Sequence, residues 1–382
     1  MATDGWQTIP LGEALTFQRG FDITREQQRA GPYPVFSSSG PKSTHSEFMV
    51  RGPGVIVGRK GSLGTAFYSD GDYWPHDTTL WVKDFHDNDP KFAYYFLQTM
   101  GFERYDAGAS NPTLNRNHIH TIPVRWPPLP IQQRIAGILS AYDEVIENNQ
   151  RRIKILEEMA RSLYREWFVH FRFPGHEKAK MVPSSLGPIP QGWEVKKLGD
   201  IADVNRTQIH PRTAPDEVHY IDISSVSPGQ IDDTITYPFT EAPGRARRIV
   251  QHADILWSCV RPNRRSHALV MQPDHGTIAS TGFAVLTATK VPFTFLYLAT
   301  TTDDFVTFLA NNATGAAYPA VTATTFEDAV LLIPPVALLK KFGEATIPMA
   351  EKIHILQRQN QNLHRTRDLL LPRLLSGQVN VA

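Results

Sequence analysis

The chain has 382 residues, of which 41% are hydrophobic, and a formal net charge of +1. This length suits two or three domains, and this apolar content excludes wholesale disorder. No apolar run reaches the ~18 residues that a membrane helix needs, the first residues do not form a secretory signal, and the single cysteine, Cys259, excludes an internal disulfide and a cysteine-clustered zinc site. We therefore expect a reduced, cytoplasmic protein.

A mixed α/β block is expected over residues 5–128. Val55–Val57 and Thr79–Val82 are short apolar runs bounded by Gly, Pro and Asp, which is typical of strands. Residues 91–100 have the pattern of a short helix rich in aromatic side chains. The acidic and basic side chains of the block nearly balance, so an attraction to nucleic acid would have to come from local basic patches.

A turn with two glycines follows the first of these strands. Arg59 and Lys60 precede the glycines, and Ser62 and Thr65 lie between and after them. Glycines let backbone N–H groups approach phosphate closely, so we predict that these four residues contact a DNA backbone; the alternative is an ordinary hairpin turn. The turn is not a nucleotide-binding phosphate loop, because no Gly-Lys-Ser/Thr is present.

A polar segment, Asn111–Arg116, lies near the end of the first block. Asn115 and Arg116 can recognise adenine and guanine edges in a major groove; alternatively, the asparagine caps the next element through an Asx turn. His118 and His120 are expected to alternate along one strand face. We expect these histidines to be structural rather than metal ligands, because no third ligand lies near them in the sequence.

A long helix is expected to begin near Pro130, since proline suits the first helical turn. Its apolar stripe has the steps of a heptad pattern with one stutter. The stripe consists of Ile135, Ile138, Tyr142, Ile146, Asn149, Ile153, Leu156, Ala160, Leu163 and Trp167. The following stretch, residues 172–192, is rich in Pro, Gly and Ser and has no apolar period, which indicates an interdomain linker.

A second mixed α/β block is expected over residues 192–335. Ile255–Trp257 and Phe283–Leu286 correspond to the two strands of the first block, and residues 293–310 correspond to its helix. Tyr318–Thr322 is the counterpart of the polar segment of the first block.

The second block contains a dense group of arginines between residues 244 and 268, opposed there only by Asp254. Arginine forks suit phosphate and the O6/N7 edge of guanine, so we predict DNA contact; the alternative is a solvated surface with ion pairs to distant carboxylates. The candidate DNA contacts of this block are Arg245, Arg247, Arg248, Arg261, Asn263, Arg264, Arg265 and Thr322.

The two halves of the chain repeat one another in order. Gly5-Trp6 and Leu11-Gly12 recur after 187 residues as Gly192-Trp193 and Leu198-Gly199, and Trp126–Ile131 recurs after 207 residues as Ile333–Leu338. A shift of 207 residues also places a second stripe at Phe342, Ala345, Met349, Ile353, Leu356, Asn360, Leu363, Arg367, Leu370 and Leu374. We expect two helices packed along their length as an antiparallel coiled coil, in a pseudo-two-fold molecule with one globular block at each end.

Two asparagines, Asn149 and Asn360, interrupt the stripes on opposite helices. They are either tolerated polar groups near a helix crossing or a device that fixes the register, as a buried asparagine does in coiled coils.

Four segments carry a resemblance to a known family. They are the helix entry Pro127–Ala136, the segment Leu186–Trp193, the strand and turn Ile255–Asn263, and the tail Arg367–Gly377. In these segments and in its repeat, the chain resembles the DNA-specificity subunit of Type I restriction-modification systems. The Pro-Pro-Leu-x-x-Gln helix entry and the tail are specific features, whereas the two blocks match only loosely.

The resemblance implies two target recognition domains, residues 1–128 and 192–335, that each bind one half of a bipartite DNA site. Residues 129–171 and 336–382 would be spacer helices, with a linker over residues 172–191, and would dock two methyltransferase subunits; a restriction/translocase subunit would join that core. The chain itself would hold no cofactor and no metal and would perform no chemistry. S-adenosylmethionine would bind to the methyltransferase subunits, and ATP and Mg to the restriction subunit.

The sequence contains no convincing enzyme motif. Pro-Pro occurs without the preceding Asn or Asp and the following aromatic residue of an adenine methyltransferase, and no phosphate loop or Gly-x-Ser-x-Gly is present. Two alternatives remain: a freestanding DNA-binding or scaffold protein whose coiled coil bridges partners, and a single-chain modification enzyme.

Overall fold

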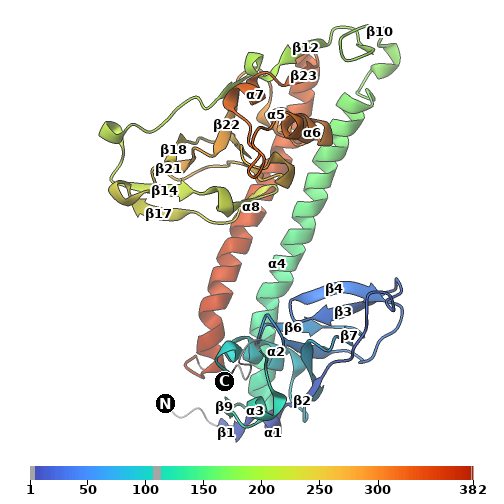
Figure 1. Cartoon of the computed structure of the whole chain (residues 1–382), viewed down its shortest axis with the longest axis vertical. Coiled ribbons are helices and arrows are strands. Elements are labelled where there is room, and N and C mark those ends of the chain that lie inside the picture. Colours follow the sequence, from blue (N-terminus) through green and yellow to red (C-terminus); the bar gives the residue numbers. More distant parts are fainter. Residues whose placement is uncertain (1–4, 106–112, 380, 382) are drawn as a thin grey trace. The chain divides into compact units, whose positions relative to one another are not determined.

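The computed structural model describes residues 5–105, 113–379 and 381. The chain forms two compact units. Unit 1 comprises Met1–Asn149 with Gln359–Ala382, and unit 2 comprises Gln150–Arg358. The two long helices, α4 (Leu129–Tyr164) and α8 (Val336–Leu375), each contribute residues to both units (Figure 1).

The central sheet of unit 1 is antiparallel and has a buried middle strand. Its spatial order is β2 (Thr16–Arg19), β8 (Thr79–Asp84), β5 (Gly54–Gly58) and β6 (Ala66–Ser69). All residues of β5 are buried, which suits its run of β-branched side chains. α2 (Pro90–Gln98) packs against β5 and β6, and the side chain of Asp89 caps it by accepting a hydrogen bond from the N–H of Phe92 at 2.8 Å.

Two smaller sheets complete unit 1. β3 (Tyr33–Ser37) pairs antiparallel with β4 (Gly40–His45) and parallel with β7 (Trp74–Pro75). β1 (Gln7–Pro10) pairs antiparallel with β9 (Pro123–Trp126), so the beginning and the end of the first block lie side by side. The helical segments between these strands are α1 (Leu11–Ala14), η1 (Phe102–Tyr105) and α3 (Arg116–His120).

Unit 2 repeats this plan element by element. Its antiparallel central sheet has the order β13 (Ala202–Val204), β22 (Phe283–Ala288), β19 (Ile255–Ser258) and β20 (His267–Leu269). β12 (Glu194–Lys197) pairs with β23 (Val330–Ile333) as β1 pairs with β9. α5 (Phe293–Thr300) and α6 (Asp303–Asn311) follow β22, and α7 (Ala323–Glu327) precedes β23. The sequence repeat is therefore a repeat of the fold, although residues 293–310 form two helices where one was expected.

A further sheet of unit 2 has the order β17 (Ile235–Pro238), β14 (Glu217–Ile221), β21 (Thr277–Ser280) and β18 (Ala246–Ile249). Its β14 and β21 are parallel, as β3 and β7 are in unit 1. The remaining short elements are η2 (Arg165–Val169), η3 (His176–Lys178), β10 (Met181–Val182), β11 (Ile189–Pro190), η4 (Leu198–Asp200), η5 (Pro211–Thr213), η6 (Ile223–Ser225), β15 (Val226–Ser227), β16 (Gln230–Ile231), η7 (Phe239–Glu241) and η8 (Pro262–Arg264).

The expected packing of two long antiparallel helices is confirmed. In unit 1, the earlier part of α4 meets the later part of α8, where Arg367 Nη1 donates a hydrogen bond to Asp143 Oδ1 at 2.5 Å. In unit 2, Tyr164 at the end of α4 lies against Phe342 near the start of α8, with ring centroids 6.2 Å apart. Within each unit, α4 and α8 therefore run in opposite directions.

The predicted stripe needs one correction in the first turns of α4. Ile138 is 38% exposed, whereas its neighbour Leu139 is fully buried. These turns pack into the core of unit 1, which also contains Ile135 and Ala136. A straight helix with 3.6 residues per turn drifts away from a strict heptad seam, and here the drift brings Leu139 inward.

The two asparagines of the stripes form a buried hydrogen-bonded pair in unit 1. Asn149 Nδ2 donates to Asn360 Oδ1 at 2.9 Å, and Asn360 Nδ2 donates to the carbonyl of Ile146 at 3.4 Å. Their side chains are only 4% and 8% exposed. Because a shift of either helix would leave buried amides without partners, this pairing favours the register interpretation.

The segment expected to be a linker is folded. β10 pairs with β11, Ile189 is buried, and Phe173 and Val182 pack against the core of unit 2. Isolated apolar side chains make these contacts, which explains why the segment shows no apolar period.

The asparagine pair predicts opposite results for single and double substitutions. Asn149→Leu should lower the free energy of unfolding by about 1–3 kcal/mol, because it leaves the buried Oδ1 of Asn360 without its donor. Asn149→Leu with Asn360→Leu should recover most of that loss. Urea unfolding would measure both, with Asn148→Leu, at an exposed neighbour, as the control. Equal losses in the single and double variants would contradict a paired role.

A buried histidine makes the stability of unit 2 depend on pH. His267 is 6% exposed, its ring centroid lies 4.8 Å from that of Trp257, and its Nδ1 lies 3.3 Å from the hydroxyl oxygen of Tyr297. Burial, with smaller contributions from the positive charges of Arg161 and Arg265, lowers the pKa of His267 to about 4. The folded chain therefore holds this imidazole neutral.

Since the unfolded chain takes up the proton at about pH 6.5, the stability that neutral His267 provides is complete above that pH. It is lost as the pH falls from about 6.5 toward 4, by up to about 3 kcal/mol. Unfolding of wild type and His267→Gln at several pH values would isolate this part, and His219→Gln, at a histidine outside the core, is the control. The prediction is wrong if the two curves stay parallel between pH 7 and pH 4.5.

Candidate nucleic-acid interface

The structure brings together the two polar segments that the sequence singled out in the first block. The N–H of Leu114 donates to the carbonyl of Arg59 at 2.9 Å, and Lys60 forms an isolated antiparallel bridge with Thr113. Arg59 and Lys60 therefore lie beside the residues that lead into α3. Asn111 and Pro112 lie outside the described residues.

The glycine turn after β5 is a tight hairpin. The N–H of Gly58 donates to the carbonyl of Thr65, and the N–H of Gly64 donates back to the carbonyl of Gly58, both at 2.9 Å. Gly64 has φ +75°, and a Cβ there would lie 2.5 Å from Cβ of Phe102. The hairpin interpretation is thus correct for the backbone, and Ser62 and Thr65 are exposed on it.

The basic side chains of this region lie around Asp77. Arg19 Nη2 lies 2.8 Å from Asp77 Oδ2, and Lys60 Nζ lies 3.9 Å from the same oxygen. Arg59 Nη1 donates to the backbone carbonyl of Asp77 at 3.5 Å. Three cations from two segments of the chain, the end of β2 and the exit of β5, therefore converge on one residue.

The electrostatics of this group follow from its crowding. Burial opposes the ionisation of Asp77, but the hydrogen bond from Arg19 and the charges of His76 and Lys60 outweigh it and lower the pKa of Asp77. Burial, and then the charge of Arg19, lower the pKa of Arg59. Asp77 thus stays ionised at neutral pH and offsets the repulsion among its basic neighbours.

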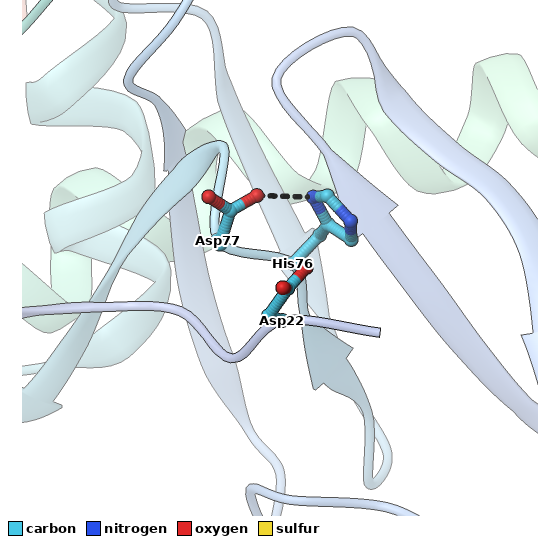
Figure 2. A group of neighbouring side chains, drawn as sticks. All are labelled: Asp22, His76 and Asp77. Carbon is cyan, nitrogen blue, oxygen red and sulfur yellow. Dashed lines mark ion pairs between the residues drawn. The ribbon is translucent and has the colours of Figure 1, made fainter. Parts of the chain in front are cut away.

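Among the residues that the structure describes, Asp22, His76 and Asp77 form the one group with the spacing of metal ligands, with ligand atoms within 4.8 Å of one another. Figure 2 shows the carboxylate of Asp77 facing the ring of His76, with Asp22 nearby; His76 Nδ1 lies 3.0 Å from Asp77 Oδ1. Because Arg19 and Lys60 already surround the Asp77 carboxylate, this group suits the cations of the chain itself better than a metal ion.

Unit 2 has the same backbone arrangement at the equivalent place. The N–H of Val321 donates to the carbonyl of Cys259 at 2.9 Å, and the N–H of Arg261 donates to the carbonyl of Pro319 at 2.7 Å. The exit of β19 thus lies beside the segment that leads into α7, as the exit of β5 lies beside the segment before α3.

Arg261 is held firmly at this turn. Its backbone is left-handed, with φ 51°, and Arg265 at the other end of η8 has φ 57°. The Arg261 guanidinium lies 4.6 Å from the ring centroid of Tyr318, which is 69% exposed, and donates to the carbonyl of Ala317 at 3.2 Å. Strained backbone of this kind is common at functional turns, and an arginine stacked on an exposed tyrosine presents a planar donor to solvent.

The other arginines of the predicted patch divide into three groups. Arg245 and Arg248 lie near the exit of β19, because the carbonyl of Arg245 accepts from the N–H of Thr281 at 2.7 Å and Arg248 interacts electrostatically with Cys259. Arg247 lies over the ring of Phe239. The remaining residues of the patch are Asn263 and Arg264, which are exposed, and Arg265, which forms an ion pair with Asp303.

Burial lowers the pKa of Arg248, whose Nε has no hydrogen-bond partner among the described residues. The alternative interpretation, in which the arginines of the patch form ion pairs with distant carboxylates, thus applies to Arg265 and not to the patch as a whole.

Asn115 and Thr322, the polar residues before the short helices α3 and α7, both act as helix N-caps. Asn115 accepts a hydrogen bond from the N–H of Asn117 at 2.9 Å, and Thr322 caps α7. The expectation that His118 and His120 lie on a strand was wrong, because they belong to α3, where His120 Nε2 accepts from the N–H of Phe17 at 3.0 Å. The asparagine cap starts a helical turn that periodicity over so few residues does not reveal.

Comparison with known proteins shows which family the chain is similar to. Residues 3–158 match the model of the Type I restriction modification DNA specificity domain. The MjaIX specificity subunit of Methanocaldococcus jannaschii is 24% identical over 76% of this chain and 69% of that protein. The MjaVIII specificity subunit of the same organism is 20% identical over 99% of this chain and 94% of that protein. Residues 3–158 thus resemble a Type I restriction modification DNA specificity domain, and the chain as a whole is similar to Type I specificity subunits.

A solved structure shares the fold of this chain. The S subunit of a Type I restriction-modification system from M. genitalium superposes with a TM-score of 0.67 at 17% sequence identity, over 98% of this chain and 97% of that one. Specificity subunits carry no cofactor of their own and are not catalytic. None of the described helices is long and apolar enough to cross a membrane.

Sequence reasoning gave no role to Arg19 or Asp77, and it named Tyr318 only as the first residue of the Tyr318–Thr322 segment. A signal for Arg19 was present, because Arg206 stands 187 residues later, at the offset of the N-terminal landmarks. The role of Asp77 and the stacking of the Tyr318 ring had no such signal, since both depend on side chains that are distant in the sequence.

The cap geometry predicts how Asn115 behaves when it is replaced. Asn115→Ala should lower the free energy of unfolding by about 1 kcal/mol, whereas Asn115→Ser should largely preserve it, because serine also caps helices. Chemical denaturation measures both, and Asn117→Ala, at an exposed position inside α3, is the control. If serine destabilises the protein as much as alanine does, the cap is not the main role of this residue.

Proposed function

We propose that this chain is a specificity subunit that binds a bipartite DNA target, with residues 1–128 and residues 192–335 each binding one half-site. The observation that carries the proposal is that basic side chains gather at the same position of both copies of the fold. Arg59 and Lys60 stand at the exit of β5, and Arg261 stands at the exit of β19, each beside the segment before a short helix.

Within each block, phosphate contacts position the domain and base-edge contacts select the sequence. The proposed contacts of the first block are Arg59, Lys60, Ser62, Thr65, Asn115 and Arg116. Those of the second block are Arg245, Arg247, Arg248, Arg261, Asn263, Arg264, Arg265 and Thr322. Arg261 is the best candidate for base recognition, because its guanidinium is already oriented by Tyr318 and a bidentate arginine prefers guanine.

The helices hold the partner subunits in this proposal. Residues 129–171 and 336–382 act as spacers, residues 172–191 connect the first spacer to the second block, and two methyltransferase subunits dock on the helices. The exposed charged residues proposed for this contact are Arg151, Arg152, Glu158 and Arg161 on α4 and Arg165 at the start of η2. A restriction/translocase subunit joins this core in the cytoplasm, and S-adenosylmethionine, ATP and Mg bind to the partners.

The proposal is tested by co-expressing the chain with a candidate methyltransferase subunit, purifying the complex and sequencing methylated sites in the accompanying DNA. A bipartite motif with a fixed gap, present only when this chain is included, is the expected result. A stable complex without any motif would favour the scaffold alternative, and methylation by this chain alone would revive the single-chain enzyme.

Exchanging one block tests whether each block binds its own half-site. Replacing residues 192–335 by the corresponding block of another specificity subunit should change one half-site and leave the other and the gap unchanged, because each block has its own set of contacts. Methylome sequencing gives both half-sites, and co-purification of the methyltransferase shows that the chimera is folded. A change in both half-sites would contradict the assignment of one block to one half-site.

A further inference from the structure

Asp77 occupies a turn where three segments of unit 1 are locked together by their backbones. The N–H of Phe21 donates to the carbonyl of Pro75 at 2.8 Å, and a Cβ on Gly20 would lie 2.1 Å from the carbonyl oxygen of His76. The N–H groups of Arg59 and Lys60 both donate to the carbonyl of Thr78, at 2.9 Å and 3.1 Å. The end of β2, the exit of β5 and the turn before β8 therefore have fixed relative positions.

The side chains on these segments combine a half-buried carboxylate with more exposed cations. The side chain of Asp77 is 16% exposed, whereas those of Arg19 and Lys60 are 54% and 39% exposed. Ion pairs with such exposed partners add little to stability. Their main effect is to restrict two long side chains that would otherwise sample many rotamers.

Most of the donors in this group remain available for a ligand. A guanidinium has five N–H donors, and Arg19 uses one of them on the carboxylate. The ammonium of Lys60 has three donors and lies 3.9 Å from Asp77, beyond hydrogen-bond distance. A phosphodiester could therefore take these donors without breaking the pair between Arg19 and Asp77.

We propose that Asp77 is a positioning residue that holds Arg19, Arg59 and Lys60 in one arrangement for the phosphates of the first half-site, and that Arg19 is itself a DNA contact. This inference rests on the proposed function, in which unit 1 binds DNA. Unit 2 lacks this device, because Thr281 stands where the paired strands align Asp77 in unit 1.

Asp77→Asn gives a test in which positioning and simple attraction predict opposite signs. The substitution removes a negative charge beside the DNA, so attraction alone should raise affinity for every sequence. Positioning instead predicts that affinity for the cognate site falls 10-fold or more, while affinity for unrelated DNA is unchanged or higher. Asp77→Glu should recover part of the loss, and Asp87→Asn, at an exposed turn of the same unit, is the control.

The measurement uses the complex assembled with its methyltransferase partner. Binding to the cognate duplex and to an unrelated duplex is titrated at several salt concentrations. Arg19→Gln should reduce the slope of log K against log salt by about 0.9, the value for one phosphate contact. Lys83→Gln, at an exposed position on β8, should leave it unchanged.

The two substitutions together separate positioning from a purely structural role. If Asp77 acts largely through Arg19, then Asp77→Asn should cause a much smaller further loss of affinity in the Arg19→Gln background. Full additivity, or equal effects of Asp77→Asn on cognate and unrelated DNA, would overturn the inference. A wild-type complex without any preference for a DNA sequence would instead refute the proposed function.

Discussion

Each globular block completes its hydrophobic core with two helix segments that lie far apart in the chain. The core of unit 1 contains Ile135 and Leu139 of α4 together with Leu374 and Leu375 of α8. The core of unit 2 contains Ala160 of α4 and a group from the start of α8, namely Leu338, Leu339 and Phe342. Because each core needs a segment of both helices, neither half of the sequence repeat can bury its apolar surface with its own residues alone.

This shared burial explains why the long helices are not purely apolar at their contact. Apolar side chains tolerate small shifts along a seam, whereas a buried amide must keep its partner. The hydrogen bond between Asn149 and Asn360 therefore makes one register of α4 against α8 better than its neighbours. The pair contributes specificity of pairing more than net stability.

The two units use the same scaffold to carry different charges. In unit 1, Asp77 collects Arg19, Arg59 and Lys60, whereas in unit 2, Arg261 lies on Tyr318. The backbone pairings at the exits of β5 and β19 are the same, so they supply the common frame. Different side chains on one frame are what two domains of one fold need in order to bind different half-sites.

The sequence by itself determined the repeat, the two long helices and the resemblance to a known family, because landmarks at constant offsets and a helical stripe are local patterns. It also located Arg59, Lys60 and the arginines after residue 244. Only the tertiary structure decided that Arg19 and Asp77 join this site, that Leu139 rather than Ile138 is buried, and that Arg265 pairs with Asp303. These features depend on contacts between residues distant in the chain, which no periodicity or spacing along the sequence encodes.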